Sequence, residues 1–387
     1  MTPYVQQHLL LAALSAALAW GVDLALARVT ALRERPWTRL LAAYALLAAP
    51  LAAWVVFVRA VDHSHSTFQF ASVAIGYYAG AFALPLAAAV RALRRPRRPW
   101  GLLGACAAAW GVGLWALLVE PDRLVTVERE LRFPAWPADC APLRVVHISD
   151  LQTVGACERE REAARRINEL RPDLIVFTGD YAAGPFRDPE PALAAARGFF
   201  AALETPRLGI VCVPGHAERE HHRARIFEGF PITYLRNSQV ELELDPPGAP
   251  QGRRLRIFGA RTLHEGYDLS SFEPSREPGV LNLVASHEPD VVWDLLERPV
   301  DLHLCGHTHG GQIVVPLFGA PMTLCGLPRR YARGLHAFGS LWLNVNPGLG
   351  MEGNFAPRIR LFCPPQIDLL VLRGGGEVPS GAVPGRS

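Results

Sequence analysis

The chain has 387 residues, half of them hydrophobic, and a formal net charge of +3 at pH 7. That length exceeds one ordinary domain, so more than one structural unit is expected. The small net charge gives no reason to expect a nucleic-acid partner.

The first third of the chain is predicted to lie in a membrane. Four long apolar segments occur there, at about Leu9–Ala27, Leu40–Val58, Phe68–Ala89 and Leu102–Val119. Each is close to the ~20 residues that a membrane-spanning helix needs. A signal peptide would account only for the first segment, and buried helices of a soluble domain are the alternative. Residues 1–119 are therefore expected to form a four-helix transmembrane region.

Arginine gives this region an orientation. The links between the first and second segments and between the third and fourth are rich in arginine: Arg28, Arg33, Arg35, Arg39, Arg91, Arg94, Arg95, Arg97 and Arg98. Because basic links stay in the cytoplasm, both links are expected there. After four spans, the rest of the chain would emerge on the extracytoplasmic side.

The remainder reads as an α/β domain over residues 143–373, preceded by a connector at 120–142. Apolar strands alternate with amphipathic helices, for example at Glu158–Leu170 and Pro191–Leu203, a pattern typical of α/β layering. The tail from 374 to 387 is rich in glycine and proline and is expected to be disordered.

Polar residues capable of binding a metal follow the predicted strands of this domain. They are Asp150 and Gln152 after the first strand, Asp180 after the second, His216 and Glu218 after the third, His287 after the fourth, and His307 and His309 after the fifth. Side chains at the carboxyl ends of such strands gather at one edge of a sheet, where ligands usually bind. A site of aspartate and histidine favours Mn, Fe, Zn or Ni.

The last motif, Gly306-His307-Thr308-His309-Gly310-Gly311, is the most specific of these. Two histidines two residues apart on an extended segment lie on the same face. A glycine-flanked turn lets both imidazoles converge on one point.

The ordered motifs resemble those of the calcineurin-like metallophosphoesterase family: D-x-H, G-D, G-N-H-D/E, H and G-H-x-H. The resemblance covers Leu143 to about Arg373, and Gly310-Gly-Gln-Ile, Gly348-Leu-Gly and Pro364-Pro-Gln-Ile are similar to the family's membrane-associated branch. It implies a four-layer α-β-β-α sandwich with two divalent metal ions. One ion would be held by Asp150, His309 and Gln152 and the other by His216, His287 and His307, with Asp180 bridging them.

Two motifs depart from the family pattern. Gln152 replaces a metal-binding histidine, so it either offers its carbonyl oxygen to the metal or only forms hydrogen bonds beside the site. In Gly215-His216-Ala217-Glu218, an ungapped alignment puts His216 at the ligand asparagine and Ala217 at the histidine that acts as general acid. A shifted alignment puts His216 at that catalytic histidine instead.

The general acid therefore has several candidates. An alanine transfers no proton, and the loss of a positioned acid costs ~10²–10⁴-fold in rate. His216 and Glu218 are predicted as catalytic, and His221 and His222 are further candidates that a solvated helix start would equally explain.

The resemblance implies a membrane-anchored, metal-dependent phosphohydrolase. Its substrate would be a phosphoester or pyrophosphate of a phosphorylated small molecule or lipid, such as an envelope precursor. The alternative is a degenerate domain that binds metal or a phosphorylated ligand and acts as a sensor or assembly module. Three arginines after the last motif, Arg329, Arg330 and Arg333, either face an anionic substrate or form a solvated loop.

Overall fold

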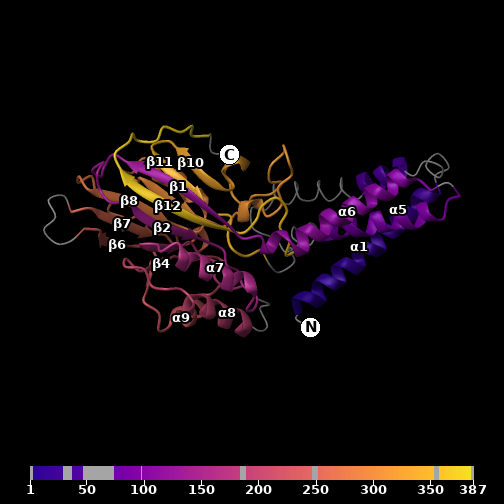
Figure 1. Ribbon diagram of the computed structural model, residues 1–387, viewed down its shortest axis with the longest axis horizontal. Helices are drawn as coiled ribbons and strands as arrows, with labels where there is room; N and C mark the ends of the chain where they lie inside the picture. Colours follow the sequence, from indigo (N-terminus) through magenta and orange to yellow (C-terminus); the bar gives the residue numbers. More distant parts are fainter. Residues whose placement is uncertain are drawn as a thin grey trace. The chain divides into compact units, whose positions relative to one another are not determined.

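The computed structural model describes residues 3–28, 37–46, 74–96, 98–183, 189–245, 252–352 and 357–384. The chain divides into two compact units (Figure 1). One comprises Met1–Val119 and Glu352–Ile359, and the other comprises Glu120–Met351 and Arg360–Ser387.

The first unit is helical. Its described elements are α1 (Pro3–Ala27), a helix over residues 37–46, and α6 (Trp100–Leu118). A further helix is described from residue 74 and continues through the π-helical turn η1 (Ala79–Ala83) into α5 (Leu84–Leu93). Three of these helices contain segments long and apolar enough to cross a membrane: Leu9–Leu26, Ala74–Leu93 and Trp100–Asp122. Many of their leucines are exposed, as expected for helices surrounded by lipid.

These three segments correspond to the first, third and fourth predicted spans. The second predicted span is helical over residues 37–46, but its remainder, residues 47–58, lies outside the described residues. The start of the third predicted span, residues 68–73, also lies outside them. The number of spans therefore stays a prediction.

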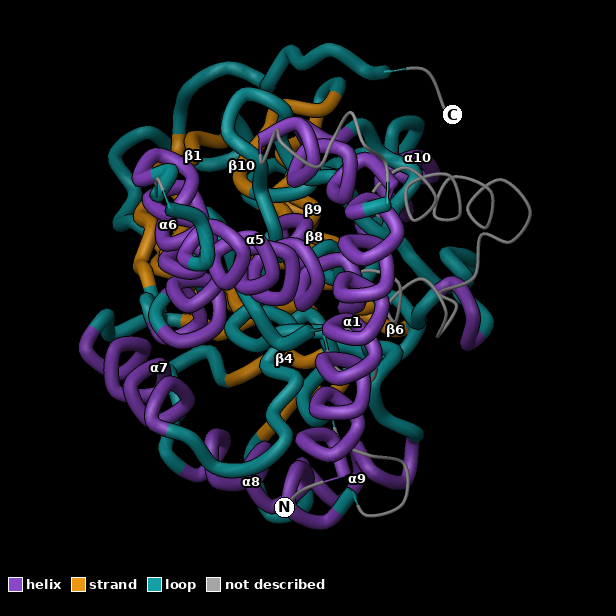
Figure 2. The backbone as a smooth tube through the Cα atoms, turned by 90° about the vertical axis from the view of Figure 1, so that its right-hand side faces the viewer, coloured by secondary structure: helices purple, strands orange, loops and turns teal. Residues whose placement is uncertain are grey.

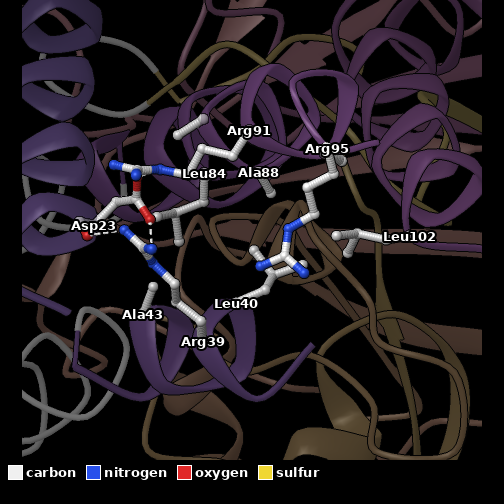
Figure 3. Close-up of a pocket in the computed structure, with 11 residues that line it drawn as sticks. Asp23, Arg39, Leu40, Ala43, Leu84, Ala88, Arg91, Arg95 and Leu102 are labelled. Carbon is white, nitrogen blue, oxygen red and sulfur yellow. Dashed lines mark hydrogen bonds and ion pairs between the residues drawn. The ribbon is translucent and has the colours of Figure 1, made fainter. Parts of the chain in front are cut away.

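One carboxylate joins three helices of this unit. Asp23 on α1 pairs with Arg39, whose Nε lies 2.9 Å from Oδ1, and with Arg91 on α5. Figure 3 shows these side chains around a cavity that Arg95 and Leu102 also line. A buried carboxylate is stable among apolar helices only when such partners neutralise it.

The second unit contains two six-stranded mixed sheets, which confirms the α/β prediction. The first has the order β1-β12-β2-β3-β4-β5 and the second β10-β11-β9-β8-β7-β6. The strands of the first sheet are β1 (Val125–Phe133), β2 (Leu143–Ile148), β3 (Leu174–Phe177), β4 (Ile210–Cys212), β5 (Ile232–Tyr234) and β12 (Gln366–Gly374). Those of the second are β6 (Ser238–Glu243), β7 (Arg254–Gly259), β8 (Val280–Ala285), β9 (Leu302–Cys305), β10 (Gly334–Phe338) and β11 (Leu341–Val345).

Strand alternation produces two apolar cores on opposite faces of the first sheet. On β2, Val145 packs in the core that contains residues of both sheets, whereas Val146 packs in the core with α7 and α8. The helices of this unit are α7 (Glu158–Glu169), α8 (Glu190–Ala201), α9 (Glu220–Phe227) and α10 (Val292–Leu295). Figures 1 and 2 show α7, α8 and α9 together along one side of the domain. The outer face of the second sheet packs with the short α10 and with loops.

The structure of the α/β domain differs from the prediction at both ends of the domain. The strand β1 falls inside the predicted connector 120–142 and pairs in parallel with β12. Alternating charged residues on this edge strand hide it from a search for apolar runs. In the predicted disordered tail, Gly381 N donates to Gly339 O at 3.0 Å, so the described part of the tail follows the domain surface.

Candidate metal centre

The candidate site lies at the carboxyl ends of five strands. Parallel pairing joins β2, β3 and β4 in one sheet and β7, β8 and β9 in the other. The side chains of interest follow β2, β3, β4, β8 and β9: Asp150, Gln152, Asp180, His216, His287, His307 and His309. The structure brings these predicted residues together, as expected for parallel strands whose carboxyl ends meet.

The backbone of the site is held in an uncommon conformation. Six non-glycine residues around it have positive φ angles: Asp150, Gln152, Asp180, His307, His309 and Gln312. Such angles cost about 1–3 kcal/mol each and cluster at functional sites, where the surrounding structure imposes them. The strand-end loops are therefore built to aim these side chains.

Asp150 is buried beneath the last motif. Its Oδ2 accepts a bond of 3.0 Å from His307 N, and its Oδ1 lies 3.4 Å from His309 Nε2. Any side chain larger than glycine at position 306 would overlap Ser149 and Asp150. Burial raises the pKa of Asp150 to about 6, so this carboxylate lacks full charge compensation.

Asp180 is fixed by four groups. Its Oδ1 accepts from His216 N at 2.5 Å and from Ala217 N at 2.8 Å. Its Oδ2 accepts from Gln152 Nε2 at 2.7 Å and lies 3.4 Å from His287 Nε2. Burial works to raise the pKa of Asp180, but His287 and the hydrogen bonds outweigh it, so the pKa lies well below its ordinary value. This carboxylate is ionised at neutral pH.

Three imidazoles meet beside Asp180. The ring centroids of His216, His287 and His307 lie 4.9 to 5.0 Å apart. His287 Nδ1 donates to Thr178 O at 2.8 Å, and His307 Nε2 donates to Leu324 O at 3.0 Å. The opposite nitrogens, His287 Nε2 and His307 Nδ1, therefore face each other at 3.3 Å.

The facing nitrogens of His287 and His307 bear on whether the site fits a metal ion. Two nitrogens that face each other with lone pairs need a positive charge between them, either a proton or a metal ion. Burial by itself lowers the pKa of His287, but the Asp180 carboxylate outweighs it and the pKa lies well above its ordinary value. Within the described part of the chain, Asp150 Oδ1 is buried and accepts no hydrogen bond. Buried carboxylates and imidazoles in this state are suitable ligands for a divalent ion.

Two ligand groups can be recognised from the distances. The potential ligand atoms of His216, His287 and His307 lie within 4.8 Å of one another, and so do those of Asp150, Asp180 and His287. His309 adjoins the second group through Asp150. The two groups share His287, whose Nε2 lies 3.4 Å from Asp180 Oδ2.

Glu288 is a site residue that the sequence analysis missed. Its Oε1 pairs with His216 Nε2 at 2.8 Å and accepts a bond of 2.9 Å from Leu263 N. Burial works to raise the pKa of Glu288, but His216 outweighs it and the pKa lies below its ordinary value. Carboxylates of this kind orient metal-binding imidazoles. The available signal was an acidic residue directly after the motif histidine His287.

Glu218 is buried on the other side of Asp180. Its Oε1 accepts from Ala182 N, and its Oε2 lies 3.9 Å from Arg223 Nε. Burial, with Asp180 adding to it, raises the pKa of Glu218 to about 8. These contacts fix the loop after Asp180, and the catalytic role of Glu218 stays a prediction.

The other candidates for a proton donor lie on α9. His221 and His222 pack against each other with ring centroids 4.1 Å apart. His221 is exposed and His222 is half-buried. Neither belongs to the two ligand groups recognised among the described residues.

A buried arginine holds the loop next to Asp150. Arg360 Nε and Nη2 donate to Gly350 O at 2.9 and 2.5 Å. Its Nη2 also donates to Pro347 O and Gly348 O, and its Nη1 donates to Cys363 O. Gly350 N in turn donates to Asp150 O at 2.6 Å. The sequence analysis noted the glycines of this loop but missed the arginine that joins them.

The fold and the site are those of a metallophosphoesterase: mixed α/β sheets whose strand ends carry aspartate and histidine side chains that could hold divalent metal ions. Residues 143–311 match the model of the calcineurin-like phosphoesterase family. The metallophosphoesterase YkuE of Bacillus subtilis is 28% identical over 277 residues, covering 70% of this chain and 92% of YkuE. The phosphodiesterase YaeI of Escherichia coli is 29% identical over 262 residues, covering 65% and 90%. The UDP-2,3-diacylglucosamine pyrophosphatase LpxG of Chlamydia muridarum is 26% identical over 308 residues, covering 66% and 92%.

Residues 143–311 form a calcineurin-like phosphoesterase domain, and the relatives support a phosphoester hydrolase. The family resemblance seen in the sequence is thereby confirmed.

Proposed function

We propose that this protein is a membrane-anchored phosphohydrolase that uses two divalent metal ions to hydrolyse a phosphoester or pyrophosphate of a lipid or envelope precursor. The observation that carries the proposal is the contact of two ligand groups through His287 and Asp180. Two adjoining groups of this kind are what a pair of ions with a shared carboxylate requires.

The proposed assignment takes His216, His287 and His307 from one group and Asp150 and Asp180 from the other, and it adds Gln152 and His309 from the family resemblance. Asp150, His309 and the Gln152 carbonyl oxygen would hold one ion. His216, His287 and His307 would hold the other, and Asp180 would bridge the two. A bound pair of ions would polarise the phosphoryl oxygens and supply a hydroxide nucleophile near neutral pH. The metal can be Mn, Fe, Zn or Ni, since these accept carboxylate and imidazole ligands.

The protein side chains position this chemistry. Asp180 is immobilised by the backbone of His216 and Ala217, so its oxygens keep their places without a rearrangement. Glu288 Oε1 lies 2.8 Å from His216 Nε2, so this carboxylate would orient the ring and leave Nδ1 available to an ion. His216 and Glu218 stay the candidates for proton transfer to the leaving group, because Ala217 cannot serve.

The remaining features of the proposal are the setting and the substrate. LpxG, by its name, hydrolyses the pyrophosphate of a lipid precursor, and three apolar helices of this chain suit membrane association. Arginine in the helix links favours an extracytoplasmic position for the domain. We further propose four membrane-spanning helices and a four-layer α-β-β-α domain.

The alternative of a domain that only binds its ligand rests on the two altered motifs, with Gln152 in the first and Ala217 in the other. The His216–Glu288 pair supports the catalytic proposal, because a carboxylate that orients a ligand imidazole is a feature of working metal sites.

The test uses the full chain purified in detergent. Metal content is measured after loading with Mn²⁺ or Zn²⁺, and turnover is measured with a soluble phosphodiester and with UDP-2,3-diacylglucosamine. We expect two ions per chain, and Asp180→Asn should lose metal and at least about 10² in turnover. Asp139→Asn, at an exposed aspartate of the same domain, is the matched control. One ion or none, with turnover unaffected by Asp180→Asn, would refute the binuclear proposal.

A further inference from the structure

Four large apolar side chains stand exposed on the domain next to the metal centre. The exposed fractions are 42% for Val315, 109% for Leu317, 57% for Phe318 and 51% for Phe362. We call these four residues the apolar tip. Isolated exposed leucines are common on soluble proteins, but a group of apolar side chains that includes a fully exposed leucine indicates a binding surface.

The backbone places the four residues on two adjoining segments. Val315 and Gly319 exchange hydrogen bonds of 2.9 Å, so Leu317 and Phe318 form the end of a tight turn. Val314 N donates to Leu361 O at 2.9 Å, which brings Phe362 beside the start of that turn. The tip therefore has a defined shape and is not a frayed loop.

Both ends of the segment that carries the turn are attached to metal-ligand histidines. Gln312 N, at the start, donates to His309 O at 2.9 Å. Leu324 O, at the other end, accepts from His307 Nε2 at 3.0 Å. Whatever binds the apolar tip is thus held close to the candidate metal centre.

Two arginines contact the tip, and a third, Arg330, packs on the neighbouring Tyr331. Arg329, Arg330 and Arg333 are all exposed. The Arg329 guanidinium lies 4.4 Å from the centroid of the Phe318 ring, and Arg333 donates to Phe362 O at 3.0 Å. The chain has no aspartate or glutamate from Gly306 to Met351. An acidic side chain from outside this segment, Asp290, accepts a hydrogen bond from Gly326 N in the described structure. The charge of the segment suits a surface that bears phosphate groups.

We propose that the apolar tip inserts into the interfacial layer of a bilayer that contains anionic lipid, while the three arginines bind lipid phosphates. Leucine and phenylalanine beside arginine are the side chains that enter this layer. The domain would stay within reach of the bilayer, because residues 119–124, which join α6 to β1, extend no further than about 20 Å. Resting on the proposed function, this arrangement would let a lipid substrate reach the metal centre without leaving the membrane.

The test places a fluorescent probe on the tip of the full chain in vesicles. Leu317→Cys is labelled with an environment-sensitive dye, and Arg161→Cys, at an exposed position on α7, is the matched control. The native cysteines of the domain are buried or half-buried, so labelling of the unsubstituted chain gives the background. The vesicles are phosphatidylcholine with or without phosphatidylglycerol, and some lipids carry a quencher on the acyl chain.

We expect acyl-chain quenching at position 317 but not at 161, and more of it with phosphatidylglycerol present. Quenching that is equal at the two positions would overturn the proposal. A blue shift at 317 without acyl-chain quenching would also overturn it, and would indicate a protein partner or a second copy instead.

A second pair of measurements separates this proposal from the proposed function. The quenching is repeated with Asp180→Asn, which should leave it unchanged whether or not the protein hydrolyses lipid. Leu317→Ser with Phe318→Ser should then lower turnover of a vesicle-borne substrate several-fold and leave turnover of a soluble phosphodiester unchanged. An equal loss on both substrates would mean that the turn only supports the fold.

Discussion

Replacing Arg360 with methionine should destabilise the phosphoesterase domain strongly. The side chain is fully buried, and its guanidinium supplies five hydrogen bonds to the carbonyls of Pro347, Gly348, Gly350 and Cys363. Methionine has a similar length, so little cavity forms, but all four carbonyls lose this donor. Gly348 O keeps a bond of 3.2 Å from Gln366 N, so three acceptors are left without this donor or a replacement. At about 1 kcal/mol or more for each of them, the loss is about 3 kcal/mol or more. That agrees with the ~3–5 kcal/mol that removal of one partner from a buried charged network costs.

The assay is thermal unfolding of the full chain in detergent, followed by intrinsic fluorescence at a fixed scan rate. A domain of this size shifts by roughly 2–4 °C for each kcal/mol, so the midpoint should fall by roughly 6–12 °C. Arg161→Met, at an exposed arginine paired with Glu158, is the control and should leave the midpoint unchanged. A decrease of less than about 2 °C for Arg360→Met would refute the reasoning, because it would mean that water or a rearranged loop satisfies the carbonyls.

Three further predictions concern the metal ligands and the buried histidines. Gln152→His should bind the first metal several-fold more tightly, since imidazole replaces an amide that now donates to Asp180. Unchanged metal affinity in a chelator competition would count against Gln152 as a ligand. Glu288→Gln should lower kcat by about 10–100-fold and move the pH–rate profile, because the ring of His216 loses its orienting carboxylate. An unchanged pH–rate profile would leave Glu288 with a structural role only. Burial lowers the pKa of His147 and of His303 to about 3, whereas an unfolded chain protonates them near 6.5. The unfolded state therefore binds more protons below pH 6.5, and stability should fall as pH falls, by about 1.4 kcal/mol per unit for each histidine. His303→Gln should halve the histidine contribution to the dependence of the unfolding free energy on pH. Denaturant titrations at about pH 4 to 7, between the folded and unfolded pKa values, measure this dependence. An unaltered dependence would contradict the low pKa of His303.

The order and place of the ligand residues follow from the sequence alone. Apolar runs of four to eight residues predict strands such as β2 and β9, and a polar residue directly after such a run lies at a strand end. Parallel strands in an α/β sheet bring those ends to one edge, so Asp150 and His307 could be assigned to one site although 157 residues separate them. Long apolar segments likewise predicted three helices that are long and apolar enough to cross a membrane.

Only the tertiary structure decided which groups complete the site. The edge strand β1 has no apolar run, and its place depends on pairing with β12 at the far end of the chain. Glu288 and Arg360 act through contacts that no local spacing encodes: a carboxylate that meets the ring of His216, and a guanidinium that joins carbonyls from two loops. Periodicity reports which face of an element is buried, whereas these contacts depend on how distant segments pack. For that reason the candidate ligands could be placed together from the sequence, and the residues that contact and fix them could not.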